Sequence, residues 1–155
     1  MTAEEFIDFI GNTAGMICAD YNLPASVCIA QAAIESGWGK SCIGNYNYFG
    51  RKYNGEGNYV VKDTQEWSPA VGYYDTTARF QSYDSLEDAI KDWCVLMTEE
   101  PAYSEALDTW HNTWDVEEFI RAMAPVYATD PEYADKIVAT INANNLMRFD
   151  GWDDE

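Results

Sequence analysis

One nearly uncharged segment, residues 24–36, constrains the fold more than any other part of the chain. The whole protein carries 27 Asp and Glu residues, yet this segment holds only Glu35. Pro24 suits the first turn of a helix, and Gly37 and Gly39 follow as stop signals, so residues 24–36 are predicted to form a helix. A helix that is apolar nearly all round must be covered by other elements. The sequence therefore predicts a fold in which other helices surround this one.

Helical periodicity and capping signals recur on both sides of that segment. Thr2 and Glu5 have the spacing of a capping box, and the apolar residues after them follow a helical period. Ser85 and Asp115 each stand at the start of a further amphipathic stretch, and Asp130 precedes a proline that suits a helix start. These signals predict further helices at residues 3–20, 85–98, 101–109, 116–124 and 131–144.

The middle of the chain, residues 44–83, has a different character. It is rich in glycine, tyrosine, valine and threonine, and residues 58–61 and 79–83 resemble short strands. We therefore expect a small antiparallel β lobe with loops inside a single α+β domain that spans residues 1–155. A junction between two lobes is a common place for a ligand cleft. The acidic tail, residues 150–155, is expected to be a solvated end.

The charge balance excludes some classes of partner. The formal net charge of -18 argues against nucleic acid and against an anionic membrane, and it favours a monomer because like charges repel. No apolar run is long enough to span a bilayer. The chain opens with acidic residues where a signal peptide needs basic ones, so no export signal is expected here. A protein without such a signal would have to leave the cell by another route, or would be a fragment of a larger secreted protein.

Metal sites and nucleophile sites find little support. The four cysteines form no Cys-x-x-Cys pair, and His111 is the only histidine, so neither a metal nor a cofactor is predicted. Cys18 and Cys28 lie in apolar helical stretches and are expected in the core, while the disulfide state stays open. Ser36 lacks the preceding glycine of a nucleophile elbow. His111 stands near two tryptophans and is expected to be structural.

Glu35 is the strongest candidate for chemistry. It is the only acid between Asp20 and Glu56 and it ends the uncharged helix. At 100° per residue it shares a face with Gln31. We expect its carboxyl group to be partly withdrawn from water, as a general acid that works near neutral pH requires. The competing interpretation is an ordinary acid at the end of a capped helix.

Five short motifs occur in chain order, at residues 30–41 (AQAAIESGWGKS), 47–50 (NYFG), 64–67 (TQEW), 80–83 (FQSY) and 127–137 (YATDPEYADKI). Together they resemble the motifs of glycoside hydrolase family 73, the cell-wall glucosaminidases, over nearly the whole chain. The resemblance implies a lysozyme-like fold with a mainly helical lobe and a small β lobe beside the cleft. It also implies hydrolysis of the β-1,4 bond between N-acetylglucosamine and N-acetylmuramic acid in peptidoglycan.

The resemblance assigns roles to individual residues. Glu35 matches the general acid, Glu66 matches the second carboxylate, and Tyr127 matches a tyrosine near the acid. A substrate-binding set is implied at Gln31, Trp38, Asn47, Phe49 and Tyr133.

The chain also departs from the family pattern at four positions. Tyr46 and Tyr48 stand where Asn and Leu are usual, Arg51 replaces an apolar residue, and Gln81 stands where Arg is usual. None of these changes removes a carboxylate. They leave the reaction in place and put only the subsite preferences in question.

Two alternatives stay open at this point. A muramidase or lytic transglycosylase would cut the other bond of the same polymer, and a single Glu without a required partner would fit it. A catalytically inactive wall-binding or phage structural domain belongs to a different class, and the presence of both carboxylates argues against it. Phage lysin and secreted autolysin are both compatible with the sequence.

Overall fold

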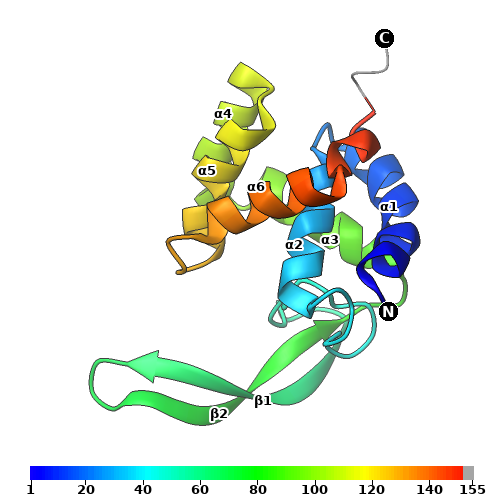
Figure 1. Cartoon of the computed structure of the whole chain (residues 1–155). Helices are drawn as coiled ribbons and strands as arrows, with labels where there is room; N and C mark the ends of the chain where they lie inside the picture. The colour runs from blue at the N-terminus through cyan, green and yellow to red at the C-terminus, as the bar shows by residue number, and fades with distance from the viewer. Residues whose placement is uncertain (152–155) are drawn as a thin grey trace.

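The computed structural model describes residues 1–151 and has an α+β architecture, in which a helical body carries a two-stranded antiparallel arm (Figure 1). The predicted tail residues 152–155 lie outside the described part. The helices are α1 (Ala3–Asp20), α2 (Ala25–Ser36), α3 (Leu86–Glu99), α4 (Ser104–Thr113), α5 (Val116–Tyr127) and α6 (Tyr133–Asn144), with short 3-10 helices η1 (Pro101–Tyr103) and η2 (Leu146–Phe149). The arm consists of β1 (Asn58–Ser68) and β2 (Gly72–Ser82).

Helix α2 occupies the centre of the helical body, as its lack of charge predicts. Every residue from Ala25 to Ala33 is buried. Helices α1 and α6 and the 3-10 helix η2 all pack against it, with α6 crossing its side (Figure 1). The helix ends at Gly37, whose φ of 58° places it in the left-handed region that glycine adopts at little cost.

The start of α2 is capped by a residue far away in the sequence. Pro24 makes no side-chain cap, and the carboxylate of Asp150 takes that role by accepting hydrogen bonds from the Ser26 backbone N–H (2.7 Å) and hydroxyl (2.8 Å). A carboxylate at a helix N-terminus is favourable for both its hydrogen bonds and the helix dipole. Asp150 is only 5% exposed, so the prediction of a solvated end was wrong at this residue.

The local capping signals are largely confirmed. Thr2 and Glu5 form the predicted capping box of α1, and Ser85 and Asp115 accept hydrogen bonds at the starts of α3 and α5. Helix α6 differs, because it begins at Tyr133 and the carboxylate of Asp130 accepts from the Glu132 backbone N–H ahead of it. The predicted start of α6 at residue 131 was therefore wrong by two residues.

The strands of the β lobe are longer than predicted. The strands run in register from the Asn58–Ser82 pair to the Ser68–Gly72 pair, where two short strands were expected, and the hairpin projects from the helical body (Figure 1). Its base is tied down by the segment 51–53, which exchanges backbone hydrogen bonds with Arg79 and Gln81. Much of the arm is exposed on both faces, so it lacks the alternation of apolar and polar residues by which strands are recognised.

Two further predictions concern membranes and cysteines. No helix in the part of the chain that the structure describes is long and apolar enough to cross a membrane. Cys18 and Cys28 are buried, as predicted, and all four cysteines are free thiols. The Sγ atoms of Cys18 and Cys94 lie 3.7 Å apart in the core between α1 and α3.

Candidate active site

The last turn of α2 carries Glu35 to the surface beside the start of α6. The Tyr133 hydroxyl donates a hydrogen bond of 2.7 Å to Glu35 Oε2. The other carboxylate oxygen, Oε1, faces Gly50, where an added Cβ would lie 3.8 Å from it. The side chain is more exposed than the sequence suggested, because Glu35 follows the buried part of α2 and lies on its open end. The expectation that its carboxyl group is partly withdrawn from water was therefore wrong.

A chain of buried side chains supports Tyr133 from behind. Gln31 Nε2 donates to the Tyr133 hydroxyl (3.2 Å), and the Trp93 indole N–H donates to Gln31 Oε1 (2.8 Å). Gln31 was expected to contact substrate, but it is fully buried and both ends of its amide hold protein partners. Trp93 was not singled out by the sequence, since a tryptophan at helical spacing carries no signal beyond core packing.

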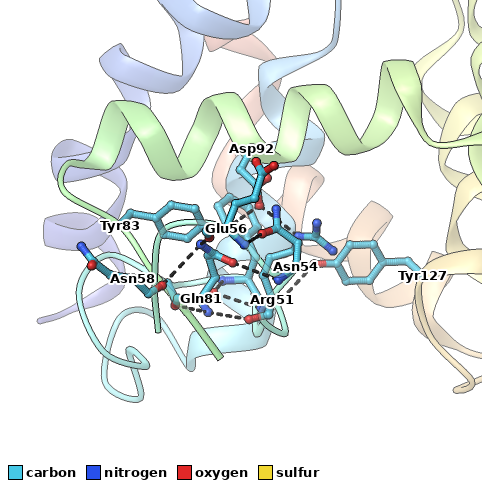
Figure 2. Close-up of polar contacts among 10 residues, drawn as sticks. Arg51, Asn54, Glu56, Asn58, Gln81, Tyr83, Asp92 and Tyr127 are labelled. Atoms are coloured by element: carbon cyan, nitrogen blue, oxygen red, sulfur yellow. Dashed lines mark hydrogen bonds and ion pairs between the residues drawn. The ribbon is translucent and has the colours of Figure 1, made fainter. Parts of the chain in front are cut away.

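Tyr127 lies directly beside Tyr133 at the end of α5. Its hydroxyl donates to the Phe49 carbonyl (3.0 Å), and the side chain points at the turn of residues 47–51 (Figure 2). Burial raises the pKa of both Tyr127 and Tyr133 well above the usual tyrosine value, so both remain protonated donors. Tyr127 thus ties α5 to the turn that faces Glu35.

The turn itself is held by Asn47, which is 1% exposed. Asn47 Oδ1 accepts from the backbone N–H groups of Phe49 (3.3 Å) and Arg51 (3.0 Å), while Nδ2 donates to the carbonyls of Arg51 (2.9 Å) and Gln81 (2.9 Å). Phe49 is buried as well. Both residues were expected to bind substrate, and in this structure they form the frame on which the turn rests.

Two of the four departures from the family pattern, Arg51 and Gln81, belong to one polar network (Figure 2). Gln81 Nε2 donates to the Glu56 carbonyl (2.8 Å), and Gln81 Oε1 accepts from the Asn54 backbone N–H (3.2 Å). An arginine has no acceptor and could not receive that second bond. Gln81 therefore closes the 54–58 loop onto the base of the hairpin.

Arg51 connects the same turn to helix α3. Its Nε atom lies 3.1 Å from Asp92 Oδ2, and that carboxylate oxygen also accepts a hydrogen bond from the Tyr83 hydroxyl. Burial, together with the hydrogen bond to Asp92, raises the pKa of Tyr83 well above its ordinary value. The turn that faces Glu35 is thus fixed on three sides, by α5, by α3 and by the hairpin base.

Glu66 lies apart from this cluster, on strand β1 opposite Tyr74. Its side chain is 36% exposed, and Oε1 forms an ion pair of 2.9 Å with Lys52 Nζ. The structure therefore places the two expected carboxylates on different lobes, Glu35 on the helical body and Glu66 on the arm. Lys52 was not anticipated from the sequence, because the pair joins residues 14 positions apart on two different segments of the lobe.

Trp38 follows the end of α2 with a φ of 60° and packs edge-on against Phe6, with ring centroids 6.2 Å apart. It is partly buried, so one part of the indole remains accessible. Within residues 1–151, no group of three or more His, Cys, Asp or Glu side chains is arranged to hold a metal ion.

The fold places the chain in the class of lysozyme-like glycoside hydrolase domains. Residues 11–146 match the glucosaminidase family model, described as mannosyl-glycoprotein endo-beta-N-acetylglucosaminidase. The chain belongs to this glucosaminidase family.

Solved structures of related proteins support the fold. The catalytic domain of the autolysin Auto from Listeria monocytogenes is 35% identical with a TM-score of 0.86, over 96% of this chain and 87% of that one. A peptidoglycan hydrolase mutant from Sphingomonas sp. A1 is also 35% identical with a TM-score of 0.75, over 94% of this chain and 96% of that one. The predicted lysozyme-like α+β fold is confirmed.

Curated relatives are similar over most of this chain but are much longer. The amidase domain-containing protein SAOUHSC_02979 of Staphylococcus aureus is 33% identical over 94% of this chain and 24% of its own length. The peptidoglycan hydrolase FlgJ of Vibrio cholerae is 35% identical over 80% of this chain and 39% of its own length. The chain thus spans about a quarter to two-fifths of the length of these two relatives.

Proposed function

We propose that this chain is an endo-β-N-acetylglucosaminidase that hydrolyses the β-1,4 bond between N-acetylglucosamine and N-acetylmuramic acid in peptidoglycan. The observation that carries the proposal is the position of Glu35 at the end of the buried helix α2, where the Tyr133 hydroxyl holds its carboxylate. The names of relatives support it, since FlgJ of V. cholerae is called a peptidoglycan hydrolase and LytG of Bacillus subtilis an exo-glucosaminidase.

In the proposed mechanism Glu35 protonates the oxygen of the leaving sugar. Retaining glycosidases place their two carboxyl groups about 5–5.5 Å apart so that one can act as nucleophile. Glu66 lies on the separate arm and is paired with Lys52, which supports a different role for it. We favour either a water molecule activated by Glu66 or attack by the substrate's own N-acetyl group, with Tyr127 positioned near that group. No cofactor enters this mechanism.

The hairpin arm offers aromatic surface for sugar rings. Trp67 and Tyr73 are paired directly across the two strands and are 60% and 73% exposed. Aromatic faces of this kind provide large contact area for the apolar face of a sugar at low entropic cost. Successive residues of a strand point to opposite faces, so these two rings lie on the face opposite Glu66 and its partner Tyr74. On the face of Glu66, Tyr74 is 43% exposed and supplies the aromatic surface beside that carboxylate.

We also propose the oligomeric state, the location and the partners of the chain. Residues 1–155 act as one catalytic domain, as a monomer, on the cell wall outside the cytoplasm. Partners other than peptidoglycan glycan strands, such as nucleic acid or a membrane surface, do not fit the net charge of -18. Release as a phage lysin and secretion as an autolysin are both compatible with this function.

The deciding experiment is mass spectrometry of digested peptidoglycan after borohydride reduction. Reduced N-acetylglucosamine ends are expected. Reduced muramic acid ends would instead show a muramidase, an alternative favoured by one observation: a probable N-acetylmuramidase of Lactococcus lactis is 33% identical over 97% of this chain and 36% of its own length. Anhydro-muramic ends would show a lytic transglycosylase.

The role of Glu35 has its own test. Glu35→Gln keeps the shape of the side chain but removes its transferable proton, so wall hydrolysis should fall by a factor on the order of 10²–10⁴. Circular dichroism should show an intact fold, because the side chain is exposed and a neutral amide is easily accommodated there. Near wild-type hydrolysis by an intact variant would rule out Glu35 as the acid.

A further inference from the structure

A single line of hydrogen bonds runs from the protein core to the carboxylate of Glu35. It starts at the Trp93 indole on α3, passes through Gln31 on α2 and reaches the Tyr133 hydroxyl on α6. Tyr133 then contacts Glu35 Oε2 at 2.7 Å. Trp93 and Gln31 are fully buried and Tyr133 is 4% exposed, so water does not compete for the two bonds that precede Glu35.

The chemistry of the first member sets the direction of the whole line. An indole nitrogen can only donate, so the amide of Gln31 must turn its oxygen toward Trp93. The amide NH₂ group then faces Tyr133 and donates to the tyrosine oxygen. Tyr133 has one hydrogen, and with its oxygen accepting from Gln31 that hydrogen is directed to Glu35 Oε2. The reverse order would leave the buried N–H of Trp93 facing another donor, which is strongly disfavoured.

We infer that Trp93 and Gln31 are positioning residues that keep Tyr133 donating to Glu35 Oε2 and thereby assign the catalytic proton to Oε1. This inference rests on the proposed function, because it takes Glu35 as the general acid. Glu35 Oε2 accepts the hydrogen of the Tyr133 hydroxyl, so this oxygen does not carry the carboxyl proton. The proton therefore resides on Oε1, the oxygen that faces Gly50 and the turn of residues 47–51.

Nearby charges are consistent with a fixed donor at Tyr133. Burial is the main reason that the pKa of Tyr133 lies well above its usual value, and the charge of Glu35 adds to it. Tyr127 on α5 and Tyr103 on η1 act on this pair, and Arg51 of the turn acts on Tyr127. Both tyrosines also have raised pKa values, and Arg51 stays charged beside Asp92, so none of the three changes its charge in the neutral range.

The test begins with Trp93→Phe, which keeps a buried ring but removes the indole N–H. The Gln31 amide is then free to turn over, and the hydrogen of Tyr133 is shared between Gln31 and Glu35. Loss of one hydrogen bond to the ionised carboxylate favours its protonated form, so the alkaline limb of the pH profile of kcat should move to higher pH. The value of kcat at the optimum should fall by about 2- to 10-fold, the worth of one hydrogen bond.

Tyr133→Phe tests the direction of the line. If Tyr133 donates to Glu35, its removal also moves the alkaline limb to higher pH. If Glu35 instead donated to the tyrosine oxygen, removal of the tyrosine hydroxyl would move the alkaline limb to lower pH. That result would overturn the inference. In the Tyr133→Phe background, Trp93→Phe should cause no additional displacement of the limb, because the connection between the two residues is already broken.

A matched control separates this effect from a loss of packing. Trp110 is also fully buried and donates its indole N–H to the Asn22 carbonyl (2.7 Å), between α4 and the loop after α1. Trp110→Phe should lower the melting temperature in the manner of Trp93→Phe but leave the alkaline limb in place. The inference is overturned if Trp93→Phe lowers only the melting temperature, or if both tryptophan variants displace the limb equally.

The same set of variants distinguishes this inference from the proposed function. If an intact Glu35→Gln variant retains wall hydrolysis, the general acid is misassigned and both proposals fail. If Glu35→Gln is inactive while Trp93→Phe leaves the limb unchanged, only the line of hydrogen bonds is rejected. All measurements use the chain of residues 1–155.

Discussion

Tyr127 and Tyr133 stack face to face, with ring centroids 5.9 Å apart and planes only 4° from parallel. One is the last residue of α5 and the other is the first residue of α6. Their hydroxyls diverge, because Tyr127 bonds the Phe49 carbonyl and Tyr133 bonds Glu35. The stack therefore connects the turn of residues 47–51 with the carboxylate that it faces.

Removal of the Tyr127 hydroxyl should loosen that connection. Tyr127→Phe keeps the stacked ring but leaves the Phe49 carbonyl without its donor, at a cost of about 1–3 kcal/mol. Because Gly50 of the same turn faces Glu35 Oε1, wall hydrolysis should fall by about 10-fold or more, as expected when a catalytic group is misplaced. Turbidity assays and thermal melts measure both effects. Tyr21→Phe, directly after the end of α1, is the control and should change neither.

The two carboxylates should differ in how deeply their loss reduces activity. If Glu66 activates water, Glu66→Gln should reduce hydrolysis about as severely as Glu35→Gln, by a factor on the order of 10²–10⁴. A clearly milder loss would support attack by the N-acetyl group, with Glu66 only stabilising charge. Lys52→Met removes the ion-pair partner of Glu66 and keeps the length of the side chain. The Lys52→Met change should affect activity only if the position of Glu66 matters. A Glu66→Gln variant with unchanged activity would exclude Glu66 from the mechanism.

Moderate salt should raise activity on intact walls before high salt lowers it. The protein carries a net charge of -18, and cell walls also carry carboxylates and often phosphates. Salt at 0.1 M reduces the Debye length to about 10 Å and so weakens the repulsion between them. Rates of wall clearing between about 0.01 and 0.5 M sodium chloride measure this directly. A steady decline from the lowest salt would show that a local basic patch governs binding.

Asp150 should contribute to stability through the start of α2. Asp150→Ala removes the acceptor of two hydrogen bonds from Ser26 and leaves those buried groups unpaired. The free energy of unfolding should fall by about 1–3 kcal/mol in urea denaturation. Asp108→Asn, an exposed change on α4, should leave it unchanged. An Asp150→Ala variant as stable as the parent would mean that water replaces the carboxylate.

Stability should decline at alkaline pH. Burial raises the pKa of Tyr48 from 10.0 to about 12, and it raises the pKa values of Tyr83, Tyr127 and Tyr133 further. Between the unfolded and folded values the unfolded chain binds fewer protons, so the free energy of unfolding falls as pH rises. This contribution is fully present below pH 10 and, for Tyr48, is lost by about pH 12. Urea titrations from pH 8 upward, with tyrosine ionisation followed by absorbance, test the expected decline.

Much of the fold could be predicted from local patterns. The capping box of Thr2 and Glu5, the cap at Ser85 and the stop at Gly37 depend on neighbours within four residues, and the structure has them as expected. The burial of α2 followed from its lack of charge. The position of Glu35 at its end followed from the same pattern, while the roles of Glu35 and the other site residues remain predictions.

Only the tertiary structure decided the contacts between distant parts of the chain. The line from Trp93 through Gln31, the cap that Asp150 places on α2 and the pairing of Glu66 with Lys52 each depend on how helices and hairpin meet. The strands of the exposed hairpin were predicted too short. Hydrogen bonds between the two strands hold them together, and alternating burial does not mark their full length in the sequence. Capping and periodicity act within a few residues, whereas a side chain's partner across the fold depends on the packing of every element between them.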